Sequence, residues 1–464
     1  MTYSDAIQYL YSLRWFGAKF GLENSFKLAA LAGDPQKRLR FIHVAGTNGK
    51  GSTCAMLESI YRAAGLRVGL FTSPHLVAFG ERIQVNRHVI AAREIGRLVA
   101  EMQALLEEGW GKPASHAGAY EVAAGAEATG SLHIEATVEH PTFFEVVTIM
   151  ALRYFAEQEC DLVIWETGLG GRLDATNIVT PITSVITNIQ YDHQKWIGET
   201  LASIAAEKAG IIKPGVPVIT AAEGEDALRV ITETARGQKA PLTILSREEL
   251  HQPPLDTLQL PLLGQHQRMN AAVAVATVRA LASQIPVREE TIRAGLSRVH
   301  WAGRLQLVTR SSGQKILLDG AHNVGGAGIL AASVRHYFPS AKPTLVLGIL
   351  RDKDWPSMCD ILAPLAESIL LVPVPSERSA TPQELAIACR RANPQTQVTE
   401  CASLRDALAA TTGEAFLTIA GSLYLVGEAM ELLHLSPAKA QDERGLNEWS
   451  DVSARKVAAV SSRR

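Results

Sequence analysis

This chain of 464 residues has few cysteines, a net charge close to zero and no long apolar runs. Its five cysteines form no Cys-x-x-Cys pair, which is typical of reduced thiols in a cytoplasmic protein. A formal net charge of −2 gives the protein no overall electrostatic attraction to nucleic acid or to anionic lipid. No uncharged apolar run is long enough to span a bilayer, and residues 1–8 lack the basic and apolar segments of a signal peptide. We therefore expect a cytoplasmic protein with neither a nucleic-acid nor a membrane partner.

The rest of the composition is that of a globular protein, with 47% hydrophobic and 20% charged residues. The length exceeds that of one ordinary core and indicates two to three domains. Apolar runs at 40–45, 67–71, 161–165 and 183–187 alternate with helical patterns, which predicts a parallel sheet covered on both faces. A second series of strands and helices begins near residue 315 and predicts a smaller, doubly wound α/β domain.

Breaks in these patterns give the expected domain boundaries. The first domain covers residues 1–296, a hinge covers 297–304 and the second domain covers 305–436. A stretch at about 107–140 is rich in Gly, Ala, His and Glu and lacks periodicity. We interpret it as an insertion or long loop, which is either functional or merely a surface excursion. Residues 437–464 are charged and rich in Ser and Ala, and we predict that they are disordered.

A glycine-rich loop is the strongest motif. It joins the strand at 40–45 to a helix predicted over 53–64, and it consists of Gly46, Thr47, Asn48, Gly49, Lys50, Gly51 and Ser52. Backbone N–H groups and the positive end of a helix dipole favour a phosphate at such a place. Lys50 can reach the terminal phosphates, and Ser52 can bind a magnesium ion. Only two residues separate Gly46 from Gly49, so the motif alone is ambiguous, but the strand before it and the helix after it favour a nucleotide site.

Three polar residues, Ser73, Glu166 and His193, each follow an apolar strand of the first domain. Because the carboxyl ends of parallel strands share one edge of a sheet, we expect these residues to lie near Lys50. A hydroxyl, a carboxylate and an imidazole can together bind a divalent ion that keeps waters and phosphate oxygens. Taken singly, Ser73 could only shape a turn, and His193 could cap or pack a helix.

Further polar residues occur beyond this group. Lys208 lies in a predicted helix, where the residues alone favour a solvated lysine. The segments 264–270, 301–304 and 319–323 contain Asn270, Arg304, Asp319 and His322. Asp319 and Asn323 could cap a helix. Segment 319–323 also follows a strand, and open α/β sheets bind ligands at strand ends.

Together these segments closely resemble the folylpolyglutamate synthase family of the Mur ligase superfamily. The resemblance covers roughly residues 9–433 and rests on the segments 41–52, 73–76, 166–177, 192–193, 207–212 and 318–323. It implies a P-loop-containing, Mur-ligase-like ATPase domain followed by a smaller Rossmann-like α/β domain, with the active site between them. It also implies a monomer that uses ATP and two Mg²⁺ ions. Residues 171–176 are similar to those of bifunctional bacterial members.

The resemblance also implies roles for single residues. The nucleotide would contact Thr47, Asn48, Gly49, Lys50, Gly51, Ser52, Asn270, Arg304 and Asp319. Magnesium would be held by Ser73, Glu166 and His193. Lys208 is expected to be carbamylated and to act in catalysis with Lys50 and His322. The pterin would lie against Lys19, Phe20, Gly21, Leu22, Thr142, Phe143, Phe144, Glu145, Leu173, Asp174 and Ala175.

The implied reaction is ATP-dependent amide ligation. L-Glutamate would be joined to dihydropteroate, forming dihydrofolate, and to the γ-carboxylate of tetrahydrofolates, through an acyl phosphate. The alternatives are a monofunctional folylpolyglutamate synthase, another Mur-type ligase, a nucleotide switch and a small-molecule kinase. Residues 319–323 and 172–174 favour folate over a peptidoglycan precursor, and the absence of an Asn-Lys-x-Asp element argues against a guanine-nucleotide switch. A kinase would form phosphorylated product without glutamate.

Overall fold

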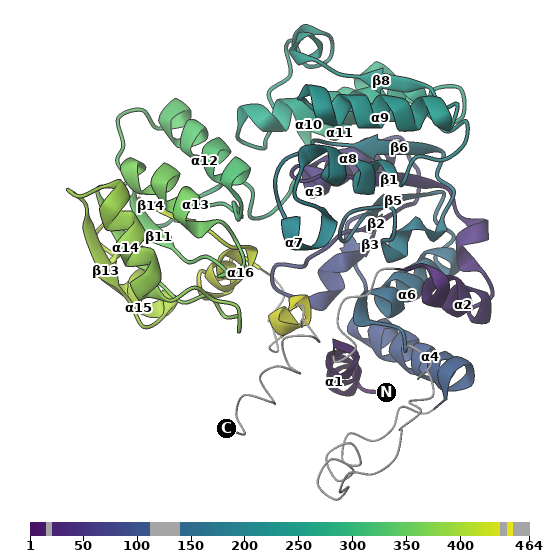
Figure 1. Ribbon diagram of the computed structural model, residues 1–464, viewed down its shortest axis with the longest axis horizontal. Helices are drawn as coiled ribbons and strands as arrows, with labels where there is room; N and C mark the ends of the chain where they lie inside the picture. The colour runs from purple at the N-terminus through teal and green to yellow at the C-terminus, as the bar shows by residue number, and fades with distance from the viewer. Residues whose placement is uncertain (15–20, 112–139, 437–442, 449–464) are drawn as a thin grey trace, which may run out of the picture.

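The computed structural model describes residues 1–14, 21–111, 140–436 and 443–448. These residues form two α/β units, each built on one sheet (Figure 1). The first sheet has the order β4-β3-β2-β5-β1-β6-β7-β8, and the second has the order β13-β12-β11-β14-β10-β9. The predicted fold class, two α/β units with largely parallel sheets, is confirmed. Among the strands of the described residues, the antiparallel ones lie at the sheet edges, namely β3 and β4 in the first sheet and β9 in the second.

The strands are short and mostly buried. The first sheet contains β1 (Phe41–Ala45), β2 (Val68–Phe71), β3 (Ile83–Val85), β4 (His88–Val89), β5 (Leu162–Glu166), β6 (Thr183–Ile186), β7 (Val218–Thr220) and β8 (Leu242–Ile244). The second contains β9 (Gln306–Thr309), β10 (Lys315–Leu318), β11 (Thr344–Leu347), β12 (Ser368–Leu371), β13 (Gln397–Glu400) and β14 (Phe416–Ala420).

Helices cover both faces of each sheet. Those of the first unit are α1 (Tyr3–Leu13), α2 (Glu23–Leu31), α3 (Lys50–Ala63), α4 (Ala92–Trp110), α6 (Phe143–Glu157), α7 (Gln194–Ile197), α8 (Leu201–Ala209), α9 (Glu225–Gly237), α10 (Gln265–Ala280) and α11 (Glu289–Ser297). Those of the second are α12 (Val324–Tyr337), α13 (Trp355–Leu362), α14 (Pro382–Ala392), α15 (Leu404–Ala410) and α16 (Leu423–Leu432). Short 3₁₀ helices include η3 (Phe79–Arg82), η4 (Ala175–Ile178) and η7 (Glu443–Asn447).

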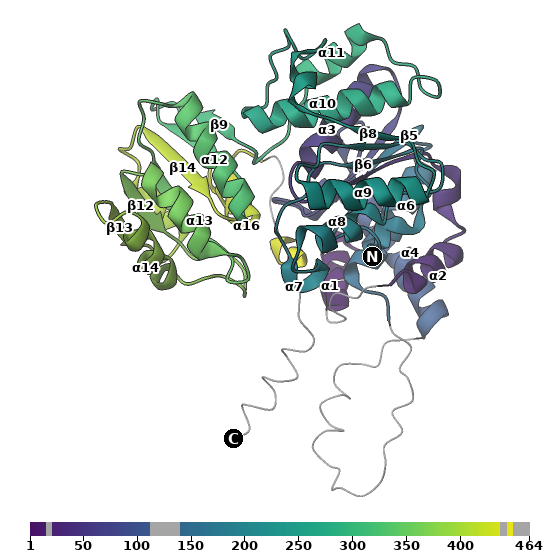
Figure 2. The ribbon, with the colours of Figure 1, turned by 45° about the horizontal axis from the view of Figure 1, so that its top comes forward.

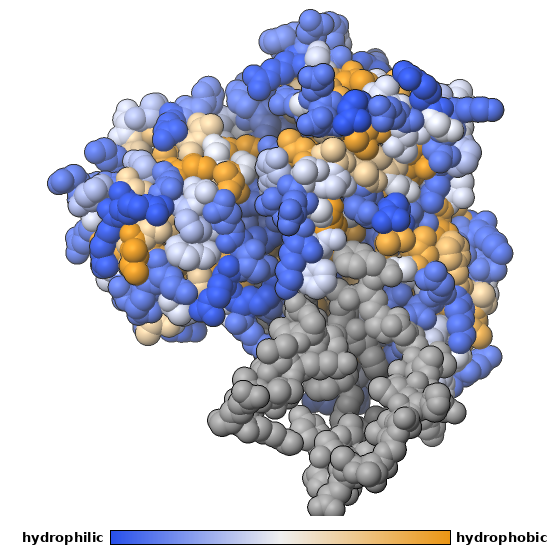
Figure 3. All heavy atoms as spheres, viewed as in Figure 1, coloured by the Kyte–Doolittle hydropathy of each residue, from blue (hydrophilic) through white to orange (hydrophobic). Residues whose placement is uncertain are grey.

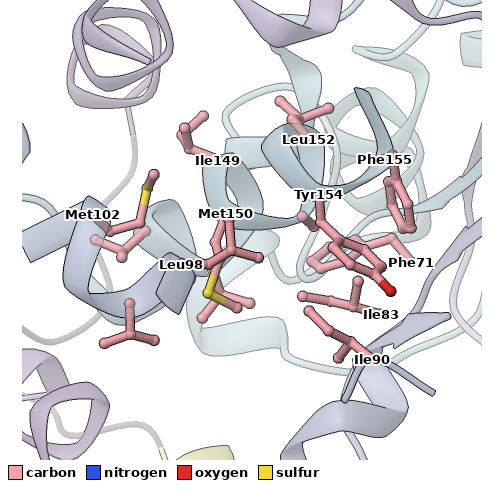
Figure 4. Packing of buried hydrophobic residues seen from close by; sticks show 14 of the residues in the cluster. Phe71, Ile83, Ile90, Leu98, Met102, Ile149, Met150, Leu152, Tyr154 and Phe155 are labelled. Atoms are coloured by element: carbon pink, nitrogen blue, oxygen red, sulfur yellow. The ribbon is translucent and has the colours of Figure 1, made fainter. Parts of the chain in front are cut away.

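The central strands of the first sheet are apolar on both faces because a helical layer covers each face. In β5, Val163 and Trp165 point toward α4 and α6, whereas Leu162 and Ile164 point toward α3 and α10. Figure 2 shows α3, α10 and α11 gathered on the second of these faces. In Figure 4, side chains of α4 and α6, among them Met150, pack against the strands and close the first core. These two cores fix the strand ends that carry the site.

Two expectations are corrected at the edges of the predicted insertion and tail. The insertion was expected from about residue 107, but α4 continues as a helix to Trp110. Residues 112–139 lie outside the described residues. The expectation of disorder over 437–464 is wrong for Glu443–Asn447, which form η7 against α1 and η3. Burial of Glu443 and Asn447 explains this order.

In the described residues, no helix is both long and apolar enough to cross a membrane.

Candidate active site

A cavity of about 420 Å³ lies between the two units. The carboxyl ends of β1, β2, β5 and β6 from the first sheet open into it, as do those of β10, β11 and β14 from the second. On the face drawn in Figure 3, polar residues line the recess between the units. The cavity brings together nearly every residue singled out in the sequence, namely Gly21, Thr47, Asn48, Gly49, Lys50, Gly51, Ser52, Ser73, Thr142, Phe143, Phe144, Glu145, Glu166, Leu173, Asp174, Ala175, His193, Lys208, Asn270, Arg304, Asp319 and His322. Leu22 is not among the lining residues, and Lys19 and Phe20 lie outside the described residues.

The glycine-rich loop enters the cavity between β1 and α3. Gly49 has φ +83 and precedes the first residue of α3, and a Cβ on it would lie 2.5 Å from Asn270 Oδ1, so only glycine suits this position. The Lys50 ammonium donates to the carbonyl oxygens of Gly46 (3.0 Å) and Thr47 (3.3 Å). Among the described residues, no carboxylate forms an ion pair with it. The amino end of α3 and an unneutralised ammonium together favour an anionic ligand such as a phosphate.

Glu166 ends β5 in the wall of the cavity and is only 4% exposed. Ser73 N donates to Glu166 Oε2 (3.1 Å), and none of the described side chains forms an ion pair with this carboxylate. Burial raises the pKa of Glu166 to about 7, although the nearby Lys50 charge opposes the rise. A buried carboxylate of this kind is stabilised by a cation, so Glu166 and Ser73 fit the expected magnesium site.

His193 precedes α7 with φ +51. Desolvation in the cavity wall, aided by the positive charge of Lys353, lowers the pKa of His193 to about 3. The imidazole is therefore neutral at physiological pH, which is the form that ligates a metal. Within the described residues, no three His, Cys, Asp or Glu side chains cluster tightly enough to hold a metal by themselves. A magnesium ion would thus depend on the Ser73 hydroxyl, waters and phosphate oxygens.

The first interpretation of Lys208, a solvated helical lysine, is wrong. Its side chain is only 4% exposed, and Nζ donates to the Gly46 carbonyl (2.9 Å), which also accepts from Lys50. Burial, followed by repulsion from Lys50, lowers the pKa of Lys208 to about 7. Part of the population is therefore a neutral, nucleophilic amine near pH 7.

Asp192, which follows β6, joins the two units. Lys353 Nζ lies 2.5 Å from its Oδ1, Asn323 Nδ2 donates to its Oδ2 (2.9 Å) and His322 Nε2 lies 3.5 Å from Oδ2. Burial raises the pKa of Asp192, but the His322 contact and the Lys353 charge outweigh burial and hold that pKa well below its usual range. Because the Gly320 carbonyl accepts from His322 Nδ1 (2.7 Å), Nε2 is the ring atom that faces the cluster.

Replacing Lys353 by methionine should leave Asp192 as a buried carboxylate without its cation. We expect a loss of about 3–5 kcal/mol in the free energy of unfolding, because removing one partner of a buried pair strands the other. Lys37→Met is the matched control, since its pair with Asp34 is exposed (71% and 34%) and its loss should change the stability little. Denaturant titration of both variants tests this, and equal losses would contradict it.

Segment 319–323 was expected either to cap a helix or to contact a ligand. Asn323 does cap α12, since its Oδ1 accepts from Gly326 N (2.8 Å). Asp319 does not cap a helix; it accepts from Leu305 N (2.8 Å) and Ala321 N (2.9 Å) and lies near the Arg304 charge. Asp319 thereby anchors the end of the hinge to the strand end, with Arg304 at the cavity wall.

The expected pterin wall of the cavity is held by local hydrogen bonds and close packing. Thr142 and Glu145 form a capping box at the start of α6, and the ring of Phe144 packs against Gly168. The Asp174 carboxylate accepts from Leu169 N (2.7 Å), Thr176 N (3.0 Å) and the Thr176 hydroxyl. Burial nevertheless raises the pKa of Asp174.

Sequence reasoning missed several cavity residues, among them Arg82, Lys353, Arg378 and Asn447. Lys353 could have been found, because it follows β11 just as the other site residues follow their strands. Arg82 lies beyond the end of β2 at the close of η3, and Asn447 lies in the predicted tail. Neither carries a local signal.

Residues 303–423 match the family described as Mur ligase, glutamate ligase domain. The chain is 34% identical to the dihydrofolate synthase/folylpolyglutamate synthase of Bacillus subtilis, over 93% of its own length and 99% of that protein's. The chain belongs to the dihydrofolate synthase/folylpolyglutamate synthase family. The folylpolyglutamate synthase structure of Thermotoga maritima agrees, with a TM-score of 0.76, 31% identity and coverage of 95% of this chain and 98% of that one. The structure of E. coli FolC in complex with DHPP and ADP has a TM-score of 0.77 at 29% identity, covering 94% and 98%. As a member of this family, the chain is a glutamate ligase.

Proposed function

We propose that this ligase adds L-glutamate to dihydropteroate, forming dihydrofolate, and to the γ-carboxylate of tetrahydrofolates, with ATP as the energy source. The observation that carries the proposal is that one cavity contains both the glycine-rich loop and the Asp174 carboxylate, which accepts a hydrogen bond from Leu169 N. The E. coli relative, whose complex contains both DHPP and ADP, supports this pairing of an acceptor with a nucleotide.

The chemistry requires an activated carboxylate, because an amide does not form spontaneously from a carboxylate and an amine in water. Transfer of the terminal phosphoryl group of ATP to the acceptor carboxylate gives an acyl phosphate, which the glutamate amine attacks with release of phosphate. Two anions must meet in the first step. Lys50 would offset their repulsion, and exclusion of water from the cavity between the units would protect the acyl phosphate. We further propose that closure about residues 297–304 completes that space.

Ser73, Glu166 and His193 are the residues that would hold magnesium. Bound there, the ion would supply positive charge to the phosphate oxygens. Glu166 supplies the negative charge for this site, and the neutral imidazole of His193 supplies a nitrogen lone pair.

Lys208 is proposed to react with carbon dioxide and become a carbamate. The reaction needs a neutral amine, and a pKa near 7 makes one available. A carbamate would also replace repulsion between Lys208 and Lys50 by attraction.

Phosphate release measured with each acceptor, with and without L-glutamate, tests the function. Release that requires glutamate and occurs with both dihydropteroate and tetrahydrofolate is expected. Release with tetrahydrofolate alone would reduce the proposal to a monofunctional folylpolyglutamate synthase. Stable phosphorylated product without glutamate would indicate a kinase, and activity only on UDP-linked acceptors would indicate another Mur-type ligase.

Replacing Asp174 by asparagine should weaken dihydropteroate use. Both Asp174 oxygens accept N–H groups, so an amide nitrogen at either position would face a donor. We expect KM for dihydropteroate to rise roughly 10–100-fold. The effect on tetrahydrofolates should be smaller, because their glutamate moiety supplies other contacts. Asp161→Asn is the control, since Asp161 accepts from Arg67 N (2.7 Å) away from the cavity. Equal KM changes in both variants would count against a pterin role.

A further inference from the structure

The segment Glu443–Glu448 returns to the cavity after the last helix of the second unit. Its helix η7, the short yellow helix between the two units in Figure 1, contacts α1 and η3. Glu443 and Leu446 are each 1% exposed and Asn447 is 5% exposed. Leu446, Asn447 and Glu448 line the cavity. Such deep burial of polar side chains near the end of a chain requires specific partners.

On the side of the first unit, Glu443 binds both the first helix and the loop after β2. Its carboxylate accepts from the Tyr3 hydroxyl (2.8 Å) and from Phe79 N (2.6 Å). The Glu443 carbonyl accepts from His75 Nε2 (3.0 Å). Since a carbonyl can only accept, Nε2 carries the proton and His75 Nδ1 is left as an acceptor.

Asn447 and His75 together hold the guanidinium of Arg82. Arg82 Nη2 donates to Asn447 Oδ1 (2.5 Å), and Arg82 Nε donates to His75 Nδ1 (2.9 Å). Asn447 Nδ2 donates in turn to the His75 carbonyl (3.0 Å). These hydrogen bonds are mutually consistent, and they hold the edge of the guanidinium formed by Nε and Nη2 in one orientation.

Arg82 is a buried cation whose hydrogen-bonding partners are neutral. It is 3% exposed, lines the cavity, and lies with Cζ 5.4 Å from the centroid of the Phe143 ring. Burial lowers the pKa of Arg82 to about 10, so it remains charged near pH 7. Within the described residues, no carboxylate forms an ion pair with it. A cation left unneutralised in a ligand cavity favours an anionic ligand group.

The last described residue of the segment reaches the second unit. Glu448 Oε2 lies 2.9 Å from Arg378 Nε, and Arg378 also pairs with Asp352 (3.0 Å). The segment therefore contacts both units at the wall of the cavity.

We propose that Glu443–Glu448 is a positioning element of the active site, in which Asn447 orients Arg82 to bind a carboxylate of the acceptor. The identity of the acceptor rests on the proposed function. Asn447 is a positioning residue, and Arg82 is the group that contacts the ligand. Nothing in the tail's composition predicts this role.

The test compares full-length Asn447→Ala with full-length Asn393→Ala. Asn393 also donates to a backbone carbonyl, that of Ala363 (3.0 Å), but it lies away from the cavity. For Asn447→Ala we expect the acceptor KM and Kd to rise roughly tenfold or more, with KM for ATP unchanged. Asn393→Ala should lower Tm without changing the acceptor KM.

The variant Asn447→Asp changes the charge beside Arg82 while nearly keeping the shape of the side chain. It keeps an acceptor beside Arg82 but adds a counter-charge, so an anionic acceptor should bind more weakly than in the wild type. If both Asn447 variants lower Tm yet leave the acceptor Kd and KM unchanged, the segment is merely structural and the inference is wrong. Acceptor binding is measured by fluorescence alongside turnover.

A wild-type protein that binds tetrahydrofolate without ligating glutamate would overturn the proposed function alone. An unchanged acceptor affinity in the variants of an active enzyme would overturn this inference alone.

Discussion

Replacing Lys50 by alanine is expected to lower the rate of ATP-dependent glutamate addition by roughly 10²–10³-fold while leaving the fold intact. The ammonium is the unneutralised cation at the amino end of α3, where it is positioned to face the phosphates as charge develops on them. Its removal deletes only two hydrogen bonds to carbonyl oxygens. The helix itself is held by buried side chains such as Leu57 and Ile60, so stability should change little.

Lys213→Ala is the matched control for this variant. Lys213 belongs to the same unit, is partly buried and also donates to a carbonyl, that of Asn177 (3.4 Å), but it does not line the cavity. Initial rates at saturating ATP and Tm are compared for both variants. Near-normal rates in Lys50→Ala would refute the assignment, whereas loss of rate accompanied by a large fall in Tm would show a folding defect.

The central strands of both sheets were predictable because most of them are short runs dominated by apolar residues. The strands β3, β4 and β9 were not, because they are very short or alternate in exposure at a sheet edge. The helix after the glycine-rich loop was expected from residue 53. It begins at Lys50, because the left-handed Gly49 lets the backbone turn directly into the helix.

The site was predictable wherever its residues follow strands. Ser73, Glu166 and His193 lie in one cavity with Lys50 because β2, β5, β1 and β6 are neighbours in the sheet. The contacts of Asn447 could not be predicted, because they join residues 365 positions apart and no local pattern in the sequence marks them. The composition of the predicted tail shows only that it is polar, and it does not show that Glu443 and Asn447 are buried against the first unit.

Glu166→Gln should increase the stability of the metal-free protein and abolish its activity. Burial raises the pKa of Glu166 from 4.5 to about 7, so the folded protein binds this proton more tightly than the unfolded chain does. The favourable contribution of the protonated form is complete below pH 4.5 and is lost as the pH rises to about 7. Above that pH, the charged carboxylate costs roughly 3 kcal/mol, and glutamine removes this cost.

At pH 8 without magnesium, Glu166→Gln should therefore have a higher Tm than the wild type, and at pH 4.5 the difference should vanish. Magnesium with ATP should raise the Tm of the wild type more than that of the variant, because the carboxylate is what attracts the cation.

The ligation rate of Glu166→Gln should fall by orders of magnitude. The control variant Glu58→Gln should stay active, because it alters another buried glutamate that is paired with Arg62 away from the cavity. A variant that is less stable than the wild type at pH 8, or that still responds fully to magnesium, would show that Glu166 is not a buried charge awaiting a metal. The combination of a stability gain with a loss of activity is specific to a carboxylate that is kept for binding a cation, because a carboxylate that only supports the fold would lower stability when replaced.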